Sequence, residues 1–116
     1  MPIKQADIEL FCEILQTEFA LKFIPKIQVE KITYYPFACF GLYEGKITKK
    51  RTKHIITIDP QHVKSKKQLF ATLAHEYVHA WQCEENLAVK HNKKTKFVAW
   101  QDYFQVKYNI DIVGMN

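Results

Sequence analysis

The residues whose types and spacing are best suited to catalysis are two histidines and a glutamate in the run His75-Glu76-Tyr77-Val78-His79. In an α-helix, residues four apart differ by about 40° around the axis and by one turn along it, so both imidazoles can reach one ion. Glu76 projects beside them. Bound Zn²⁺ lowers the pKa of a water to about 7, and a neighbouring carboxylate can then take its proton. This HExxH spacing predicts a metal site suited to hydrolysing a peptide bond.

The alternative is that His75 and His79 are ordinary core or surface histidines. On a helical wheel that starts at Leu69, the apolar residues Leu73 and Tyr77 define a core face, and both histidines fall opposite it. Their neighbours on that side are the uncharged residues Gln68, Thr72 and Gln82. Because a solvated stripe usually carries charge, the pattern favours the metal site and predicts that both histidines lie outside the packed core.

A zinc hydrolase site needs a third protein ligand. The candidates are histidines and carboxylates elsewhere in the chain: His54, His62, His91, Glu84, Glu85 and Asp102. The two glutamates follow His79 too closely on the same helix to fold back onto its ion, and Cys83 lies two turns, about 12 Å, from His75. His91 is best placed, because it follows His79 by 12 residues in an irregular stretch where the chain must turn. The alternatives that stay open are Asp102, His54 and His62.

Helices that position these residues follow from hydrophobic spacing. Apolar residues recur every three or four positions over about 6–23, where Pro25 ends the pattern, and again over 95–108. Between them, a helix over about 65–83 carries the HExxH run. Ser65 and Gln68 form a capping box, in which each side chain satisfies an unpaired N–H at the helix start.

Three strands are predicted from β-branched and aromatic residues over 27–35, 38–43 and 54–59, with a turn at Glu44-Gly45. The order of elements is typical of an α+β fold. We therefore expect one zincin-like domain over 1–116. It consists of an N-terminal helix, a small antiparallel sheet of about three strands, the HExxH helix and a C-terminal helix.

Composition and cysteine usage limit the class of protein. With 116 residues, of which 47% are hydrophobic and 25% charged, the chain is expected to be a single folded domain and not a disordered segment. No apolar run reaches the roughly 18 to 20 residues of a membrane span, and the N-terminus lacks the pattern of a secretory signal. Three widely spaced cysteines without a CxxC pair indicate a reducing, intracellular compartment, and we expect a cytoplasmic protein.

Positive charge is concentrated in the second part of the chain. Residues 46–116 hold 13 Lys and Arg against 6 Asp and Glu, whereas residues 1–45 are net negative. A solvated surface is the simpler explanation of lysine runs, but two clusters bracket the metal site in sequence, so we expect nucleic-acid binding. The candidate contacts are Lys46, Lys49, Lys50, Arg51, Lys53, Lys93 and Lys94.

The region from about Cys39 to Phe104 resembles the SprT-like zinc metalloproteases. The resemblance rests on a glycine-containing strand (Cys39-Phe40-Gly41-Leu42), a strand ending in Asp59-Pro60, and the helix segment Leu73 to Gln82 with its HExxH motif. His91 and then Phe97 and Trp100 are similar to the family's third histidine and its aromatic helix. The match is to small phage-type or bacterial-type members that consist of the catalytic core.

The resemblance implies that His75, His79 and His91 bind one zinc ion and that Glu76 is the general base. It also implies DNA-stimulated proteolysis of proteins bound or crosslinked to single-stranded or duplex DNA. We expect a monomer that acts on protein substrates and does not act at a membrane. Two alternatives are compatible with the same residues: a DNA-independent protease of one protein such as a repressor, and a non-catalytic zinc-stabilised DNA-binding module.

Two further roles are expected near the site. The strand Ile55–Asp59, if it lies at the sheet edge beside the HExxH helix, could hold an extended peptide by backbone hydrogen bonds. Tyr103 and Tyr108 are candidate hydrogen-bond donors to the oxyanion that develops during peptide hydrolysis, although aromatic residues on a helix more often belong to the core.

Overall fold

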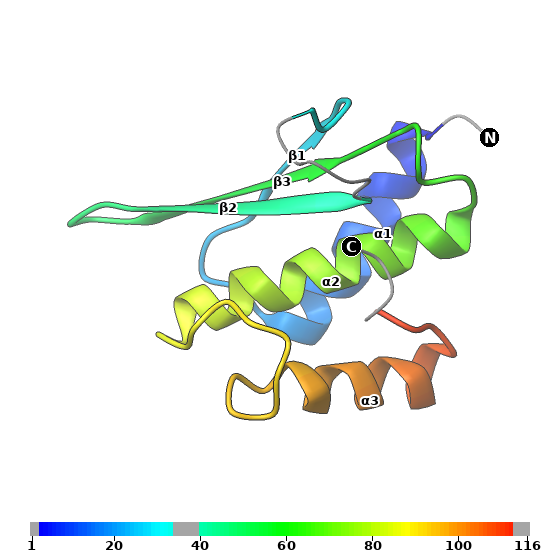
Figure 1. Cartoon of the computed structure of the whole chain (residues 1–116). Coiled ribbons are helices and arrows are strands. Elements are labelled where there is room, and N and C mark those ends of the chain that lie inside the picture. The colour runs from blue at the N-terminus through cyan, green and yellow to red at the C-terminus, as the bar shows by residue number, and fades with distance from the viewer. Residues whose placement is uncertain (1–2, 34–39, 113–116) are drawn as a thin grey trace.

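The helices and strands follow one another along the chain in the expected order. The computed structural model describes residues 3–33 and 40–112. Its elements are α1 (Gln5–Phe19), β1 (Lys26–Val29), β2 (Gly41–Ile47), β3 (Thr52–Ile58), α2 (Lys66–Glu84) and α3 (Phe97–Tyr108). Figure 1 shows α2 running along one face of the sheet, with α3 on the far side of α2. The predicted α+β class is confirmed.

The central helix α2 is enclosed on all sides. Every residue from Leu69 to Ala80 is buried, because β2, β3 and α1 pack on the helix and aromatic side chains of α3 cover another part of it. Phe11 of α1 packs on Phe70 with 5.0 Å between ring centroids, and Trp100 of α3 packs on Trp81 at 5.5 Å. His75 and His79 are therefore buried, and the expectation that they lie outside the packed core is wrong. A helical wheel identifies one apolar face but not the sheet that covers the other.

Helix α1 ends at Phe19, four residues earlier than predicted. Ala20 adopts a left-handed conformation (φ 48°), and its N–H donates to the carbonyl of Gln16. The backbone N–H groups of Lys22 and Phe23 then donate to the Glu84 carboxylate at 2.7 and 3.1 Å. The chain therefore leaves the helix early because its next residues are bound to the C-terminal end of α2.

The sheet is mixed and not antiparallel as predicted. Its strand order is β1-β3-β2, with β1 parallel and β2 antiparallel to β3. Glu84 accounts for the parallel pairing, because it binds both the segment before β1 and His54 near the start of β3. Both strands therefore begin at the same end of the sheet and run in the same direction.

The strand boundaries also differ from the predicted ones. β2 continues through the predicted Glu44-Gly45 turn, so that Gly45 pairs with His54, and the hairpin turns over 48–51 instead. There Thr48 N–H donates to the Arg51 carbonyl at 2.9 Å. β3 starts at Thr52, two residues earlier than predicted. β1 ends at Val29, earlier than predicted. Beyond it, Ile32 N–H donates to the Asp59 side chain and not to a neighbouring strand. The predicted strand positions 34–35 and 38–39 lie outside the described residues.

The two later helices begin differently, because α2 has a polar side-chain cap and α3 has none. Ser65 Oγ accepts the N–H of Gln68 at 3.1 Å, as the capping box predicts. The Gln68 side chain accepts from Lys64 N–H at 2.6 Å and not from Ser65, so the reciprocal bond is displaced by one residue. α3 begins at Phe97 and not at position 95, because Lys96 has a left-handed conformation (φ 67°). No helix in the described part of the chain is long and apolar enough to cross a membrane.

Candidate metal centre

Three histidine side chains converge on one point beside α2. His75 and His79 lie one turn apart on the helix, and His91 reaches them from the loop between α2 and α3. Their Nε2 atoms form a triangle with edges of 3.0, 3.1 and 3.2 Å. Tetrahedral zinc with Zn–N bonds of about 2.0–2.1 Å would separate its ligand atoms by roughly 3.3 Å. The three histidines can therefore hold one metal ion.

The partners of the other ring nitrogens determine which protons the imidazoles carry. His75 Nδ1 lies 2.5 Å from the carbonyl of Ile112, and His79 Nδ1 lies 2.8 Å from Gln82 Oε1. Both partners are acceptors, so each Nδ1 carries a proton and each neutral ring presents an Nε2 lone pair to the centre of the cluster. Lone pairs about 3 Å apart repel one another unless a cation lies between them, which is the arrangement that metal-binding histidines adopt.

Burial further favours neutral imidazoles. It lowers the pKa of His75 to about 3 and that of His79 to about 4, and it also lowers the pKa of His91. His75 and His79 are 0% and 5% exposed, whereas His91 is exposed. The cluster is therefore closed on the helix side and open on the loop side, as a catalytic site must be to admit a substrate.

Glu76 follows His75 on α2, and its side chain is buried where β2 approaches the helix. Its side chain is 2% exposed, and burial raises its pKa to about 8. Among the described residues, no hydrogen-bond donor faces its buried Oε2. A Cβ at Gly41 would lie 3.1 Å from this oxygen and 2.8 Å from Thr72 Cγ2, so the glycine allows β2 to pass close to the helix. Oε2 is thus an acceptor that the fold itself does not use.

Phe97 forms a common apolar wall for the three histidines. It is fully buried, and its ring centroid lies 5.0, 5.6 and 4.8 Å from those of His75, His79 and His91. The first residue of α3 therefore limits the space into which the imidazoles can rotate. This contact agrees with the expectation that an aromatic helix follows the third histidine.

The other candidate ligands have different partners. His54 Nε2 lies 2.7 Å from Glu84 Oε2, and His62 Nδ1 lies 3.3 Å from Asp59 Oδ2. Asp102 is exposed on α3. None of these alternatives belongs to the group of ligand atoms around His91. The hydroxyls of the two expected oxyanion donors are also engaged elsewhere, because Tyr103 and Tyr108 both donate to the Glu18 carboxylate.

A buried network that the sequence analysis missed lies beyond the histidine cluster. Tyr43 Oη lies 2.7 Å from His54 Nδ1, and Glu84 accepts from the other ring nitrogen. A Cβ at Gly45 would lie 2.6 Å from Tyr43 Oη, so this glycine makes room for the phenol to reach His54. Tyr43 and Gly45 lie two residues apart on one face of β2, a spacing that could have indicated this contact. The sequence alone did not indicate it, because the predicted turn at Glu44-Gly45 placed Gly45 outside the strand.

The seven predicted DNA-contacting cations are exposed in two groups. Five lie at and near the tip of the β2–β3 hairpin, which projects past the C-terminal end of α2 in Figure 1. Lys93 and Lys94 lie in the loop that carries His91. Within the described part of the chain, none of the seven forms an ion pair. Their charge is therefore available to a partner.

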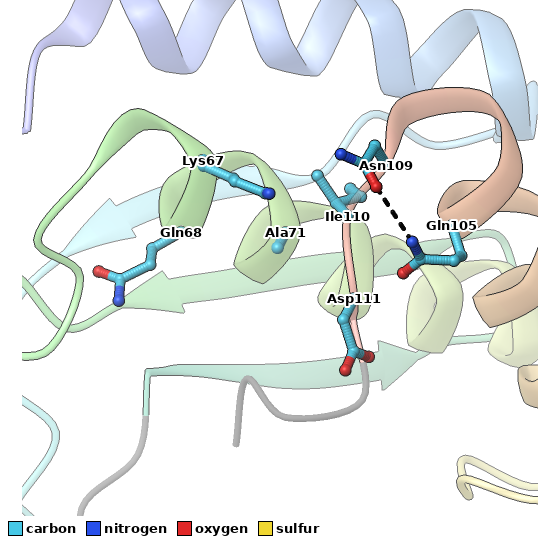
Figure 2. A pocket seen from close by; sticks show the side chains of 7 residues that line it. All are labelled: Lys67, Gln68, Ala71, Gln105, Asn109, Ile110 and Asp111. Carbon is cyan, nitrogen blue, oxygen red and sulfur yellow. Dashed lines mark hydrogen bonds between the residues drawn. The ribbon is translucent and has the colours of Figure 1, made fainter.

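A separate pocket of about 310 Å³ lies between the start of α2 and the end of α3 (Figure 2). It is lined by Lys67, Gln68 and Ala71 and, opposite them, by residues from the end of α3 onward. Gln105 and Asn109 are joined there by a hydrogen bond of 3.2 Å. The pocket includes none of the three histidines and does not belong to the metal centre.

Comparisons of the chain with protein-family models, with curated proteins and with solved structures found no match. The resemblance to SprT-like metalloproteases therefore stays a prediction from the sequence motifs.

Proposed function

We propose that this chain is a zinc-dependent metalloendopeptidase of the SprT-like type. The observation that carries the proposal is the convergence of three histidine Nε2 atoms, together with a buried carboxylate oxygen on the helix of two of them that has no partner among the described residues. Structural zinc sites usually have four protein ligands and do not need such a carboxylate. Zn²⁺ held by His75, His79 and His91 would supply Lewis-acid polarisation of a peptide carbonyl and of the attacking water.

Glu76 is the general base in this proposal. It follows His75 directly in α2, and the close approach of β2 at Gly41 restricts the space around its carboxylate. Its Oε2 can accept a proton without breaking a hydrogen bond to any described residue. The side chain is therefore placed for proton transfer and not for stabilising the fold.

An extended substrate peptide would pair with β2. The strand Ile55–Asp59 is predicted from the sequence to have this role, but β3 lies in the middle of the sheet and both of its edges are occupied by other strands. β2 is an edge strand of the described sheet, and its first residue, Gly41, lies beside Glu76. Backbone hydrogen bonds to such an edge bind peptides with little dependence on their sequence.

The exposed cations of the hairpin and the His91 loop support DNA as the second partner. Both groups lie on segments next to the metal centre, and residues 46–116 carry a net charge of +7. Phosphate contacts of this kind depend little on base sequence. We propose that DNA brings the enzyme to proteins that are bound or crosslinked to it, so that location and not peptide sequence selects the substrate.

The test is cleavage of a basic DNA-binding protein by the zinc-loaded chain, with and without single-stranded or duplex DNA. Glu76→Gln is compared with Glu85→Gln, which changes an exposed carboxylate at the end of the same helix. We expect cleavage that requires DNA, persists in Glu85→Gln and is lost in Glu76→Gln while zinc stays bound.

The other outcomes each overturn part of the proposal. Cleavage that depends on Glu76 but not on DNA would indicate a protease dedicated to a specific protein. Zinc and DNA binding without cleavage in any reaction would indicate a non-catalytic DNA-binding module.

A further inference from the structure

Gln82 lies one turn beyond His79 on α2 and is completely buried. Its side-chain amide makes three hydrogen bonds. Oε1 lies 2.8 Å from His79 Nδ1, and Nε2 donates to the backbone carbonyls of Lys90 and Thr95 at 2.8 and 3.0 Å. One side chain thus contacts a metal ligand of the helix and both sides of the loop that carries His91.

The chemistry of these partners determines the orientation of the amide. Backbone carbonyls only accept hydrogen bonds, so the atom that faces Lys90 and Thr95 must be the NH₂ group. The amide oxygen must then face His79, whose Nδ1 has to donate. His79 is consequently held with its Nε2 lone pair toward His75 and His91. A group that bound only one of these partners could not determine the His79 tautomer and the loop position together.

The loop has internal hydrogen bonds, and the Gln82 side chain joins it to α2. Thr95 Oγ1 donates to the Lys90 carbonyl at 2.8 Å, and Thr95 N–H donates to Asn92 Oδ1 at 3.0 Å. These bonds close the loop on either side of His91. The bonds from Gln82 then connect the closed loop to the helix that carries the other two ligands.

We propose that Gln82 is a positioning residue of the metal centre. It holds His79 in the tautomer that can bind metal and holds the His91 loop at the distance the ion requires. This inference rests on the metal-binding part of the proposed function and is independent of peptidase activity. Residues that orient metal ligands in this way typically contribute 10- to 100-fold to metal affinity.

The test uses the full chain and compares Gln82→Met, Gln82→Glu and Gln105→Met. Methionine has a similar volume but no hydrogen bonds, whereas glutamate can still accept from His79 but cannot donate to the two loop carbonyls. Gln105 is an exposed glutamine on α3 and provides the matched control. Zinc affinity is measured by competition with a chromophoric chelator. Hydrogen exchange of residues 90–95 and ¹⁵N NMR of the His79 ring are measured without metal.

We expect a 10- to 100-fold loss of zinc affinity in Gln82→Met, with faster loop exchange and a mixture of His79 tautomers. Gln82→Glu should show the faster loop exchange but keep the single tautomer, and Gln105→Met should match the wild type. The tautomer readout separates positioning from a structural role, because a loss of stability alone leaves the ring in its native protonation pattern.

Two results would overturn the inference. The first is zinc affinity within about threefold of the wild type in a folded Gln82→Met protein, since that is well below the expected loss. The second is an unchanged His79 tautomer in that variant; if it does not fold, unchanged loop exchange in Gln82→Glu has the same meaning. A wild-type chain that binds no zinc would instead overturn the proposed function, and the metal role of Gln82 with it.

Discussion

At the scale of single residues, the site depends on close approaches that only small side chains allow. Gly41 lies where β2 crosses α2, and its missing Cβ leaves room for Glu76 and for the Thr72 methyl group. Gly45 has the same role for the Tyr43 hydroxyl. The two glycines thus face different neighbours: a rigid methyl on a buried helix in one case and the end of a long side chain in the other.

Gly41→Ala should therefore destabilise the protein more than Gly45→Ala. The new methyl at position 41 would lie 2.8 Å from Thr72 Cγ2, which cannot move away, and we expect a loss of about 1–3 kcal/mol from overpacking. At position 45 the Tyr43 side chain can swing aside, at the cost of its bond to His54, about 1 kcal/mol. Urea denaturation of both variants measures the difference. Equal stabilities would contradict the close contact at Gly41.

At the scale of elements, Glu84 joins three parts of the fold. Its carboxylate accepts from the backbone N–H groups of Lys22 and Phe23 and from His54. It therefore holds the turn after α1, the C-terminal end of α2 and the start of β3 together. These are the elements whose mutual position makes β1 parallel to β3.

Glu84→Gln should lower the free energy of unfolding, whereas Glu85→Gln should leave it nearly unchanged. An amide at position 84 has one acceptor oxygen fewer and no charge, so at least one of the three donors loses a charged partner, and such a hydrogen bond contributes about 1.5–3 kcal/mol. Glu85 is exposed, and its replacement should change stability by no more than about 0.5 kcal/mol. Chemical denaturation at neutral pH measures both values, and equal losses would show that the network adds nothing to stability.

Asp59 provides a pH-dependent link at the other end of β3. Burial by itself would raise the pKa of its carboxyl, but hydrogen bonds from the N–H groups of Ile32 and Gln61 and the nearby His62 ring outweigh burial and lower it. Because the folded pKa lies below the unfolded value of about 3.9, the ionised group stabilises the fold above that pH. This stabilisation is lost as the pH falls through the folded pKa.

Asp59→Asn should consequently lose less stability than the wild type on acidification. The comparison is the difference in unfolding free energy between pH 7 and pH 3 for each protein, with Asp102→Asn on the exposed face of α3 as the control. We expect the control to behave as the wild type does. A pH dependence that is the same in all three proteins would show that the Asp59 hydrogen bonds do not favour its charged form.

At the scale of the whole molecule, charge is distributed unevenly along the chain. The hairpin tip and the His91 loop present exposed cations, while residues 1–45 are net negative. Figure 1 shows that the hairpin extends beyond the helices, so its cations can contact a long polymer without obstruction by the rest of the fold. Long-range attraction of a polyanion should therefore be directed to this end of the molecule.

DNA affinity should fall steeply with salt, by roughly a thousandfold between 50 and 200 mM if about six phosphates of a duplex are contacted. The triple variant Lys49→Ala, Lys50→Ala, Arg51→Ala should reduce the slope of log affinity against log salt by up to about 3. The matched control removes the same charge elsewhere, at Lys4, Lys26 and Lys31, all of them exposed. Fluorescence anisotropy at several salt concentrations gives the slopes. A similar reduction in both triple variants would indicate attraction by net charge alone.

The sequence by itself determined the features that depend on local geometry. The HExxH spacing places His75 and His79 on one side of one helix, because helical periodicity does not depend on the rest of the fold. The Ser65 cap is likewise a contact between residues three apart. The order of helices and strands follows from hydrophobic spacing, and it is confirmed even where element ends are displaced by several residues.

Only the tertiary structure decided which distant groups meet. It brings His91 to the two helical histidines, whereas His54 forms hydrogen bonds with Tyr43 and Glu84. In the sequence, His54 and His91 were both candidates for the third ligand. It also buries the side of α2 that a helical wheel predicts to be polar. The physical reason is that local periodicity says nothing about strand direction, turn position or what covers a helix, since these depend on contacts between residues far apart in the chain.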